Sequence, residues 1–225
     1  MKPIILAHRA YRDGTDPGRE NSCAAVAECF EQGWGVEIDI RRSGGRFYLS
    51  HDIGTVALAN DALSFCHLVR EMRPPAVAIN IKELGYEREL LAFLEQEQII
   101  DHVFLFDMEL LEDIPGKTAR LLSTFHPRIR IAARSSDRHE PLERALACPF
   151  STMIWADEFE RFWLTGEDVR RAKESGKFVY VISPEIHGYD MRARNRRWED
   201  FTLWGVDGIC TDYPADLSRF IAGHS

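Results

Sequence analysis

Short apolar runs rich in β-branched residues recur along the chain, and nearly every run ends at a charged or polar side chain. Each has the length and composition of a buried strand. The candidate strands are 4–7, 36–40, 47–49, 76–81, 102–106, 128–133, 152–155, 178–182 and 207–210. The segments between them carry apolar residues at helical spacing, often behind a Ser or Thr that can cap a helix. The predicted helices are 22–33, 61–72, 86–98, 108–122 with an interruption at Pro115-Gly116, 141–147, 165–175, 192–203 and 215–221.

The order of these elements predicts the fold. Strands and helices alternate about eight times without a linker, and such alternation implies parallel strands. Eight β/α units in 225 residues fit an α/β fold, a single-domain (β/α)8 TIM barrel over residues 1–225. A doubly wound sheet is the alternative, but it would spread the polar strand ends along an edge, whereas a barrel gathers them at one mouth. These strand-end residues are His8, Glu37, Asp39, Lys82, Asp107, Arg134, Asp157, Glu185 and Asp212.

The stretch from Gly33 to Asp52 contains a pair of acids on one strand. Glu37 and Asp39 are two positions apart in residues 36–40, so their side chains share one face. Adjacent buried carboxylates repel unless a cation compensates them. The pair therefore either binds a divalent metal beside the acid/base group His51, or faces water on an exposed strand. This stretch alone leaves both interpretations open.

Composition narrows the function classes. Hydrophobic residues make up 45% and charged residues 28%, which is typical of a soluble globular protein. The net charge of −8 argues against a nucleic-acid partner but permits a phosphorylated small molecule bound by local cations. Neither a signal peptide nor a membrane span is expected, because no apolar run approaches about 20 residues. The scattered cysteines without a CxxC pair indicate reduced thiols and a cytoplasmic location. They are Cys23, Cys29, Cys66, Cys148 and Cys210.

The strand-end residues suggest a reaction. Oxygen ligands of the Glu37 and Asp39 kind suit one Mg²⁺ or Ca²⁺ better than a transition metal. Two histidines, His8 and His51, suit general acid and base work near neutral pH. The candidate phosphate-binding cations are Arg9, Lys82 and Arg134, and the further candidate acids are Glu20, Asp107 and Asp157. Together these groups indicate metal-assisted cleavage of a phosphate ester.

At this point a family resemblance becomes specific. The matching segments are His8-Arg9, Glu20-Asn21, Glu37-Ile38-Asp39, His51-Asp52, Ile81-Lys82 and 205–214. With them the chain resembles the glycerophosphodiester phosphodiesterases, within the phosphatidylinositol-phospholipase-C-like barrels. The resemblance implies that His8 and His51 are the acid/base pair and that Glu37 and Asp39 bind the metal. It also implies phosphate contacts from Arg9 and Lys82.

The chain departs from this family at several positions. Asn80 stands where the family usually has a glutamate as third metal ligand, so its amide oxygen becomes the candidate ligand, with Asp107 or Asp157 as substitutes. Ala10 replaces the glycine that usually follows His-Arg. The segment 183–187 replaces a tryptophan-containing ending and adds Glu185 and His187 as further candidates. These departures indicate a divergent subgroup.

Two rival functions remain open. A non-catalytic barrel that binds a phosphorylated ligand is compatible with Asn80 as a sign of lost metal, although the presence of both His8 and His51 argues against it. A lyase of the same fold would release a cyclic phosphate, and product identification separates it from a hydrolase.

One basic run and one aromatic group lie outside these motifs. For the four arginines within 192–197, a solvated helix face is favoured over a site for an anionic headgroup. Trp155 and Phe159, with Phe162 and Trp163, either wall an apolar substrate pocket or pack against helices.

Overall fold

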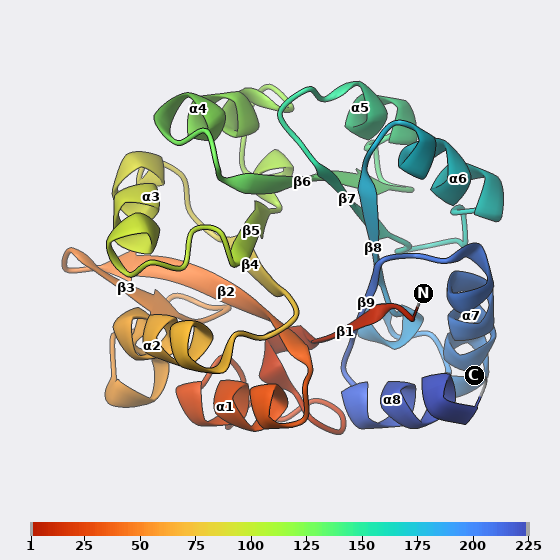
Figure 1. Ribbon diagram of the computed structural model, residues 1–225, viewed down its shortest axis with the longest axis horizontal. Coiled ribbons are helices and arrows are strands. Elements are labelled where there is room, and N and C mark those ends of the chain that lie inside the picture. Colours follow the sequence, from red (N-terminus) through yellow and green to blue (C-terminus); the bar gives the residue numbers. More distant parts are fainter. Residues whose placement is uncertain (1, 224–225) are drawn as a thin grey trace.

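The computed structural model describes residues 2–223. In this part of the chain one nine-stranded sheet has the order β1-β9-β8-β7-β6-β5-β4-β2-β3, and β1 also pairs with β2. This extra pairing closes the parallel strands into a barrel ringed by helices (Figure 1). Closure confirms the predicted TIM barrel and excludes the doubly wound sheet, whose edges stay open. The strands are β1 Ile4–Ala7, β2 Gly35–Ser43, β3 Arg46–Leu49, β4 Val77–Ile81, β5 Val103–Phe106, β6 Arg130–Ser136, β7 Met153–Asp157, β8 Phe178–Ile182 and β9 Gly208–Thr211.

The helices occupy the predicted connections. Ser22 caps α1 by accepting a hydrogen bond from Ala25 N, and Thr165 caps α6 in a capping box. The predicted helix 108–122 is only half present, because Gly116 adopts a left-handed φ of 84° and α4 begins after it. The α-helices are α1 Cys23–Glu31, α2 Ala62–Met72, α3 Glu87–Gln96, α4 Lys117–Phe125, α5 Leu142–Ala147, α6 Gly166–Glu174, α7 Met191–Trp204 and α8 Pro214–Gly223. The short 3-10 helices are η1 His8–Ala10, η2 Leu58–Asn60, η3 Met108–Leu110 and η4 Pro184–His187.

Strands β2 and β3 form an antiparallel hairpin. Strand β2 continues beyond the predicted end at Ile40 to Ser43, and Ile40 pairs with Leu49 on the returning strand. Gly44 and Gly45 make the turn at φ values of 55° and 80°, which side chains rarely adopt. The hairpin carries the chain back toward the mouth, where residue 51 follows.

Large side chains fill the inside of the barrel. The rings of Phe104 and Tyr180 lie 5.0 Å apart, and those of Phe106 and Trp155 lie 4.1 Å apart. Gly208 makes room for this packing, since a Cβ there would lie 2.3 Å from the Tyr180 ring. The interior is therefore a packed core, and Phe106 and Trp155 form the floor beneath the mouth. Within residues 2–223, no helix is both long and apolar enough to cross a membrane.

The arginines of α7 correct one expectation. Arg194 and Arg197 are only 5% and 4% exposed, so a solvated face does not describe them. Arg197 donates to both carboxylate oxygens of Glu158, and Arg194 stacks 4.1 Å from the Trp198 ring. Arg192 and Arg196 are exposed, as expected. Buried anionic and aromatic partners compensate the two buried charges.

Candidate active site

The carboxyl ends of the barrel strands surround a cleft of about 300 Å³. Its position at the mouth matches the place where TIM barrels carry their active sites. All the predicted site residues line it except Glu20 and Glu185, which lie behind its wall. The predicted residues in the wall are His8, Arg9, Glu37, Asp39, His51, Asn80, Lys82, Asp107, Arg134, Asp157 and His187.

His8 lies at the end of β1 with its ring held from one side. Its Nδ1 lies 2.6 Å from Asp212 Oδ1, and its Nε2 lies 3.9 Å from Glu37 Oε2. Burial lowers the pKa of His8, but the hydrogen bond to Asp212 and the charge of Glu37 outweigh it, so the pKa lies above its ordinary value. Because a carboxylate only accepts, Nδ1 carries the proton and Nε2 faces the acids.

A strained turn follows His8 and aims the next main-chain N–H at the acid pair. Arg9 and Ala10 have φ values of 48° and 60°, in the left-handed region where glycine is usual. Such a conformation costs a non-glycine residue roughly 1 kcal/mol. The turn directs Arg9 N to Glu37 Oε2 at 3.0 Å. Backbone geometry here therefore serves the site, although neither Arg9 nor Ala10 is a glycine.

The acid pair of β2 is buried. Glu37 and Asp39 are 2% and 1% exposed, which excludes the exposed-strand interpretation. Asn21 makes two hydrogen bonds with Asp39, both at 2.9 Å: its Nδ2 donates to Asp39 Oδ2, and its Oδ1 accepts from the main-chain N–H of Asp39. Arg9 Nε and Lys82 Nζ lie 3.6 and 3.5 Å from the Asp39 carboxylate. Burial, and then the charge of Asp39, raise the pKa of Glu37 to about 7. This is a site that favours added positive charge.

Glu20 does not line the cleft but lies behind Arg9, which does. Its Oε2 accepts hydrogen bonds from Arg9 Nη1 at 3.3 Å and from the Tyr11 hydroxyl. The Tyr11 ring in turn meets the His8 ring edge-on, with centroids 5.8 Å apart. Glu20 thus positions the arginine, and the sequence motif identified it without revealing that it lies outside the cleft.

Asn80 supplies an oxygen that lacks a partner. Its Nδ2 donates to Asp107 Oδ2 at 2.9 Å, which fixes the orientation of the amide. The other amide atom, Oδ1, is buried without a hydrogen-bond partner. Such an orphaned acceptor is rare in native proteins and indicates a missing donor, water or ion. Within residues 2–223, no group of three or more His, Cys, Asp or Glu side chains could hold a metal. Two carboxylates and one amide oxygen nevertheless fit an oxygen-preferring divalent ion.

His51 follows the hairpin on an exposed loop. Its Nδ1 lies 2.9 Å from Asp52 Oδ1, but the Asp52 side chain is 90% exposed and orients the ring only weakly. The firm contact is to the main chain: Arg41 Nε and Nη2 donate to His51 O at 3.0 and 2.7 Å. Arg41 is therefore the side chain that fixes the loop carrying His51.

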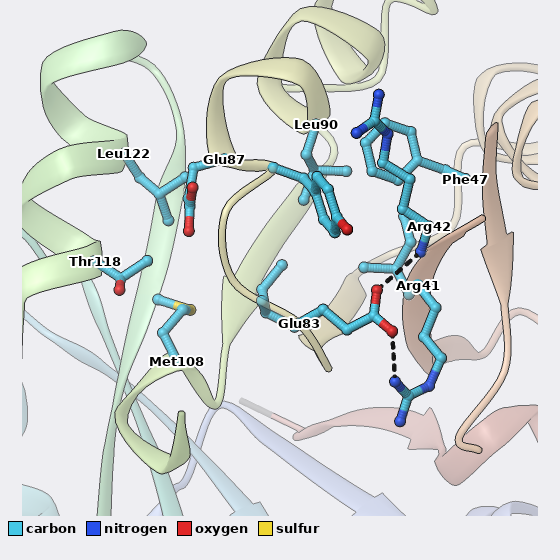
Figure 2. Close-up of a pocket in the computed structure, with 12 residues that line it drawn as sticks. Arg41, Arg42, Phe47, Glu83, Glu87, Leu90, Met108, Thr118 and Leu122 are labelled. Atoms are coloured by element: carbon cyan, nitrogen blue, oxygen red, sulfur yellow. Dashed lines mark hydrogen bonds and ion pairs between the residues drawn. The ribbon is translucent and has the colours of Figure 1, made fainter. Parts of the chain in front are cut away.

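Glu83 holds Arg41 in this position. Figure 2 shows its carboxylate between the Arg41 guanidinium, at 2.8 Å, and the main-chain N of Arg42, at 3.3 Å. The small apolar cavity beside this bridge has about 20 Å³, room for roughly one water. Sequence reasoning missed Arg41, although it continues the alternation of Glu37 and Asp39 along β2.

The half of the mouth formed by β5, β6 and β7 is built around Arg134. Its guanidinium donates to Asp107, to Glu140 at 3.0 Å and to Asp157 at 2.8 Å. Arg134 is 4% exposed. The sequence pattern predicts a strand that stops at residue 133, whereas β6 continues through Arg134 to Ser136. Burial raises the pKa of Asp107, an effect that Arg134 opposes. Nothing in the sequence marked Glu140, because it comes from the loop after the strand.

Glu185 and His187 both belong to η4 but lie differently. Glu185 accepts hydrogen bonds from Thr211 Oγ1 and, at 3.1 Å, from Asp212 N. Glu185 therefore fixes the position of Asp212, the residue that hydrogen-bonds His8. His187 reaches the cleft and hydrogen-bonds through Nε2 to Asp157 Oδ1. The aromatic wall includes Trp155 and Phe159, whereas Phe162 and Trp163 are not part of it.

Comparison with known proteins supports the fold. No protein-family model matches the chain, and no curated protein matches it. A candidate glycerophosphoryl diester phosphodiesterase from Silicibacter pomeroyi superposes with a TM-score of 0.74 at 14% identity, over 99% of this chain and 94% of that one. A glycerophosphoryl diester phosphodiesterase from Parabacteroides distasonis gives 0.71 at 17% identity, over 99% and 87%.

A third solved structure carries a reaction product. It is a phosphodiesterase from Oleispira antarctica in complex with the product sn-glycerol-3-phosphate, with a TM-score of 0.68 at 17% identity over 98% of this chain and 97% of that one. Identities this low establish a shared fold rather than a shared activity. At the level of the barrel fold, these structures bear out the resemblance to glycerophosphodiester phosphodiesterases that the sequence motifs predicted.

Proposed function

We propose that the chain is a phosphodiester hydrolase for small glycerophosphodiester-like substrates. The observation that carries the proposal is the position of His8, fixed by Asp212 and facing the buried pair Glu37 and Asp39 in the cleft. Acid/base, anionic and cationic groups thus line one cleft. The similar structures described as phosphodiesterases, one of them with sn-glycerol-3-phosphate, support this reaction class.

One divalent ion, Mg²⁺ or Ca²⁺, belongs to the proposal. Glu37, Asp39 and the orphaned Oδ1 of Asn80 would hold it. When bound, the ion would place positive charge on a phosphate oxygen and relieve the repulsion within the acid pair. The neutral Asn80 contributes less charge than the glutamate that the family usually has, so the expected affinity is modest.

Charge neutralisation and proton transfer fall to side chains of the protein itself. Arg9 and Lys82 neutralise charge on the phosphate as it builds up in the transition state. One of His8 and His51 takes the proton from the attacking hydroxyl, whether that is water or a neighbouring hydroxyl of the substrate. As the new phosphorus–oxygen bond forms and the old one breaks, the other histidine protonates the departing alcohol. With water as the nucleophile the phosphomonoester forms directly. With a substrate hydroxyl as the nucleophile a cyclic phosphate forms first, and water then opens it while the two histidines exchange their acid and base roles.

The test is turnover of a chromogenic phosphodiester and of glycerophosphodiesters, with Mg²⁺, with Ca²⁺ and with chelator. We expect metal-dependent release of an alcohol and a phosphomonoester. His8→Ala and His51→Ala should each reduce kcat about 100-fold or more, whereas His67→Ala, on the outer helix α2, should not. Absence of turnover with every ion, or full activity in both site variants, contradicts the proposal.

The same assay separates the rival functions. A cyclic phosphate as the final product identifies a lyase, and ligand binding without turnover identifies a non-catalytic barrel. The cytoplasmic location expected from the cysteines stays a prediction, which fractionation of the native cells would test.

A further inference from the structure

The mouth holds a third histidine, His187, at the end of η4 after β8. Its Nε2 hydrogen-bonds Asp157 Oδ1, and its ring stacks on Phe159 with centroids 4.3 Å apart. The side chain is 16% exposed and lines the cleft. A ring held at one edge and one face has a fixed orientation. Because the carboxylate accepts from Nε2–H, the neutral ring presents Nδ1 as an acceptor. Among the described residues, that nitrogen has no hydrogen-bond partner.

The carboxylates around His187 are committed to partners within the protein. Asp157 binds His187 through one oxygen and Arg134 through the other. Asp107 is likewise divided between Arg134 and Asn80. All four of these oxygens therefore have partners inside the protein. Among the described residues around His187, Asp107 and Asp157 therefore leave no open carboxylate oxygen with which a cationic substrate group would pair.

The aromatic rings here are not free to receive a cation either. Phe106 and Trp155 are 1% and 2% exposed, with each ring covering the other. The Phe159 ring already has guanidinium groups over it, that of Arg138 at 4.4 Å and that of Arg134 at 5.1 Å. An aromatic cage for a quaternary ammonium needs open ring faces, and these are covered.

We propose that His187 is a specificity residue that accepts a hydrogen bond from a hydroxyl on the alcohol half of the diester. The inference rests on the proposed function and adds a substrate class to it. This half of the cleft selects an uncharged, hydroxylated alcohol such as glycerol. It discriminates against a quaternary ammonium alcohol such as choline, which has no N–H or O–H for Nδ1 once it is esterified.

The experiment compares kcat/KM for glycerophosphoglycerol and glycerophosphocholine. The wild type should prefer glycerophosphoglycerol about tenfold, because a site built to hydrogen-bond a hydroxyl rejects an alcohol that lacks it. His187→Phe keeps the ring stack and the volume but removes both nitrogens. In this variant kcat/KM for glycerophosphoglycerol should fall about tenfold, mainly through KM, while the value for glycerophosphocholine does not fall, because the variant removes no contact to choline and frees Asp157 Oδ1. His67→Ala is the matched histidine control outside the cleft.

The outcomes distinguish this inference from the proposed function. A wild type that cleaves neither diester overturns the proposed function and the assignment of His187 with it. Cleavage of both diesters with equal kcat/KM, or a preference for glycerophosphocholine, overturns only the assignment. Equal losses for both substrates in His187→Phe also overturn it, because they identify a merely structural histidine. The preference of the wild type is a separate readout that does not depend on the variant folding.

Discussion

His8 Nδ1 lies 2.6 Å from Asp212 Oδ1, although 204 positions separate the two residues in the chain. The contact joins the first barrel strand to the last, β1 to β9, which lie side by side in the closed sheet. Glu185 supports the aspartate from behind through its main-chain N. Closure of the barrel therefore sets the tautomer of His8 and leaves Nε2 to face the acid pair.

Replacing the aspartate tests this relationship. In Asp212→Asn the amide can donate to Nδ1, which moves the ring proton to Nε2, the wrong nitrogen for proton exchange at the acids. We expect kcat to fall about 100-fold with little change in KM. Steady-state kinetics on the chromogenic diester measures the loss, and circular dichroism melting confirms that the variant folds. Near-normal kcat in a folded variant would contradict a role for Asp212 in orienting His8.

Arg41 should act through His51 without touching substrate. Arg41→Met removes both hydrogen bonds to the His51 carbonyl, so kcat should fall about tenfold as the loop loses its fixed position. Hydrogen exchange of the amides at 50–54 should accelerate in parallel. Arg46→Met is the control, because this hairpin arginine is exposed and pairs with Asp61. Slower turnover without faster exchange would point to another cause.

Divalent ions should stabilise the folded chain. An ion that binds only the native state at 100 times its Kd adds about 2.7 kcal/mol, which raises Tm by roughly 5 to 10 °C for a chain of this size. We expect Mg²⁺ or Ca²⁺ to raise Tm in wild type and to have no effect in Glu37→Gln. In Asn80→Ala the midpoint ion concentration should rise about tenfold. Asp113→Asn, at an exposed site on another loop, is the control. Identical Tm responses in wild type and Glu37→Gln would exclude this ligand set.

The barrel and much of its mouth were predictable because they depend on local patterns. Buried strands such as 178–182 can be predicted from their β-branched residues. In a barrel of parallel strands, the last residues of all strands lie at the same end. The sequence pattern therefore predicts that Glu37, Asp39 and Lys82 lie together at the mouth. The same reasoning predicts Asp107 and Asp157 as further candidates at the mouth, and both side chains line the cleft.

Contacts that depend on register or on loops were not predictable. Arg41 meets His51 because β3 returns the chain alongside β2, and Arg134 meets Glu140 because the loop after β6 returns to it. The burial of Arg197 depends on Glu158, 39 positions away and on a different element. A single sequence gives the spacing of residues along the chain, whereas these contacts depend on how distant segments lie next to each other in the folded structure.

Glu109 should make stability depend on pH. Burial raises its pKa from 4.5 to about 7, helped by the charges of Asp107 and Glu112 and opposed by a hydrogen bond from Arg134 N. A carboxyl with a higher pKa in the folded state stabilises the fold when protonated. That contribution is full below about pH 4 and is lost as pH rises through about 7.

Glu109→Gln removes this titration. Between pH 5 and pH 8 the free energy of unfolding should fall by roughly 2 kcal/mol more in wild type than in the variant. Urea unfolding at the two pH values measures the difference. Glu31→Gln, at an exposed position on α1, should follow the wild-type slope. Parallel slopes for wild type and Glu109→Gln would show that the carboxyl titrates normally.

The buried pair of Arg197 and Glu158 should matter far more to stability than its exposed neighbour. Arg197→Ala leaves the Glu158 carboxylate, 2% exposed, without its partner, so the free energy of unfolding should fall by about 3 kcal/mol or more. Arg196→Ala, one position away on α7 and exposed, should change it by less than about 0.5 kcal/mol. The double variant Arg197→Met with Glu158→Leu should recover part of the loss, because no unpaired buried charge remains. Urea denaturation of the four proteins measures these values. Equal effects at positions 196 and 197 would return Arg197 to the solvated face that the sequence had suggested.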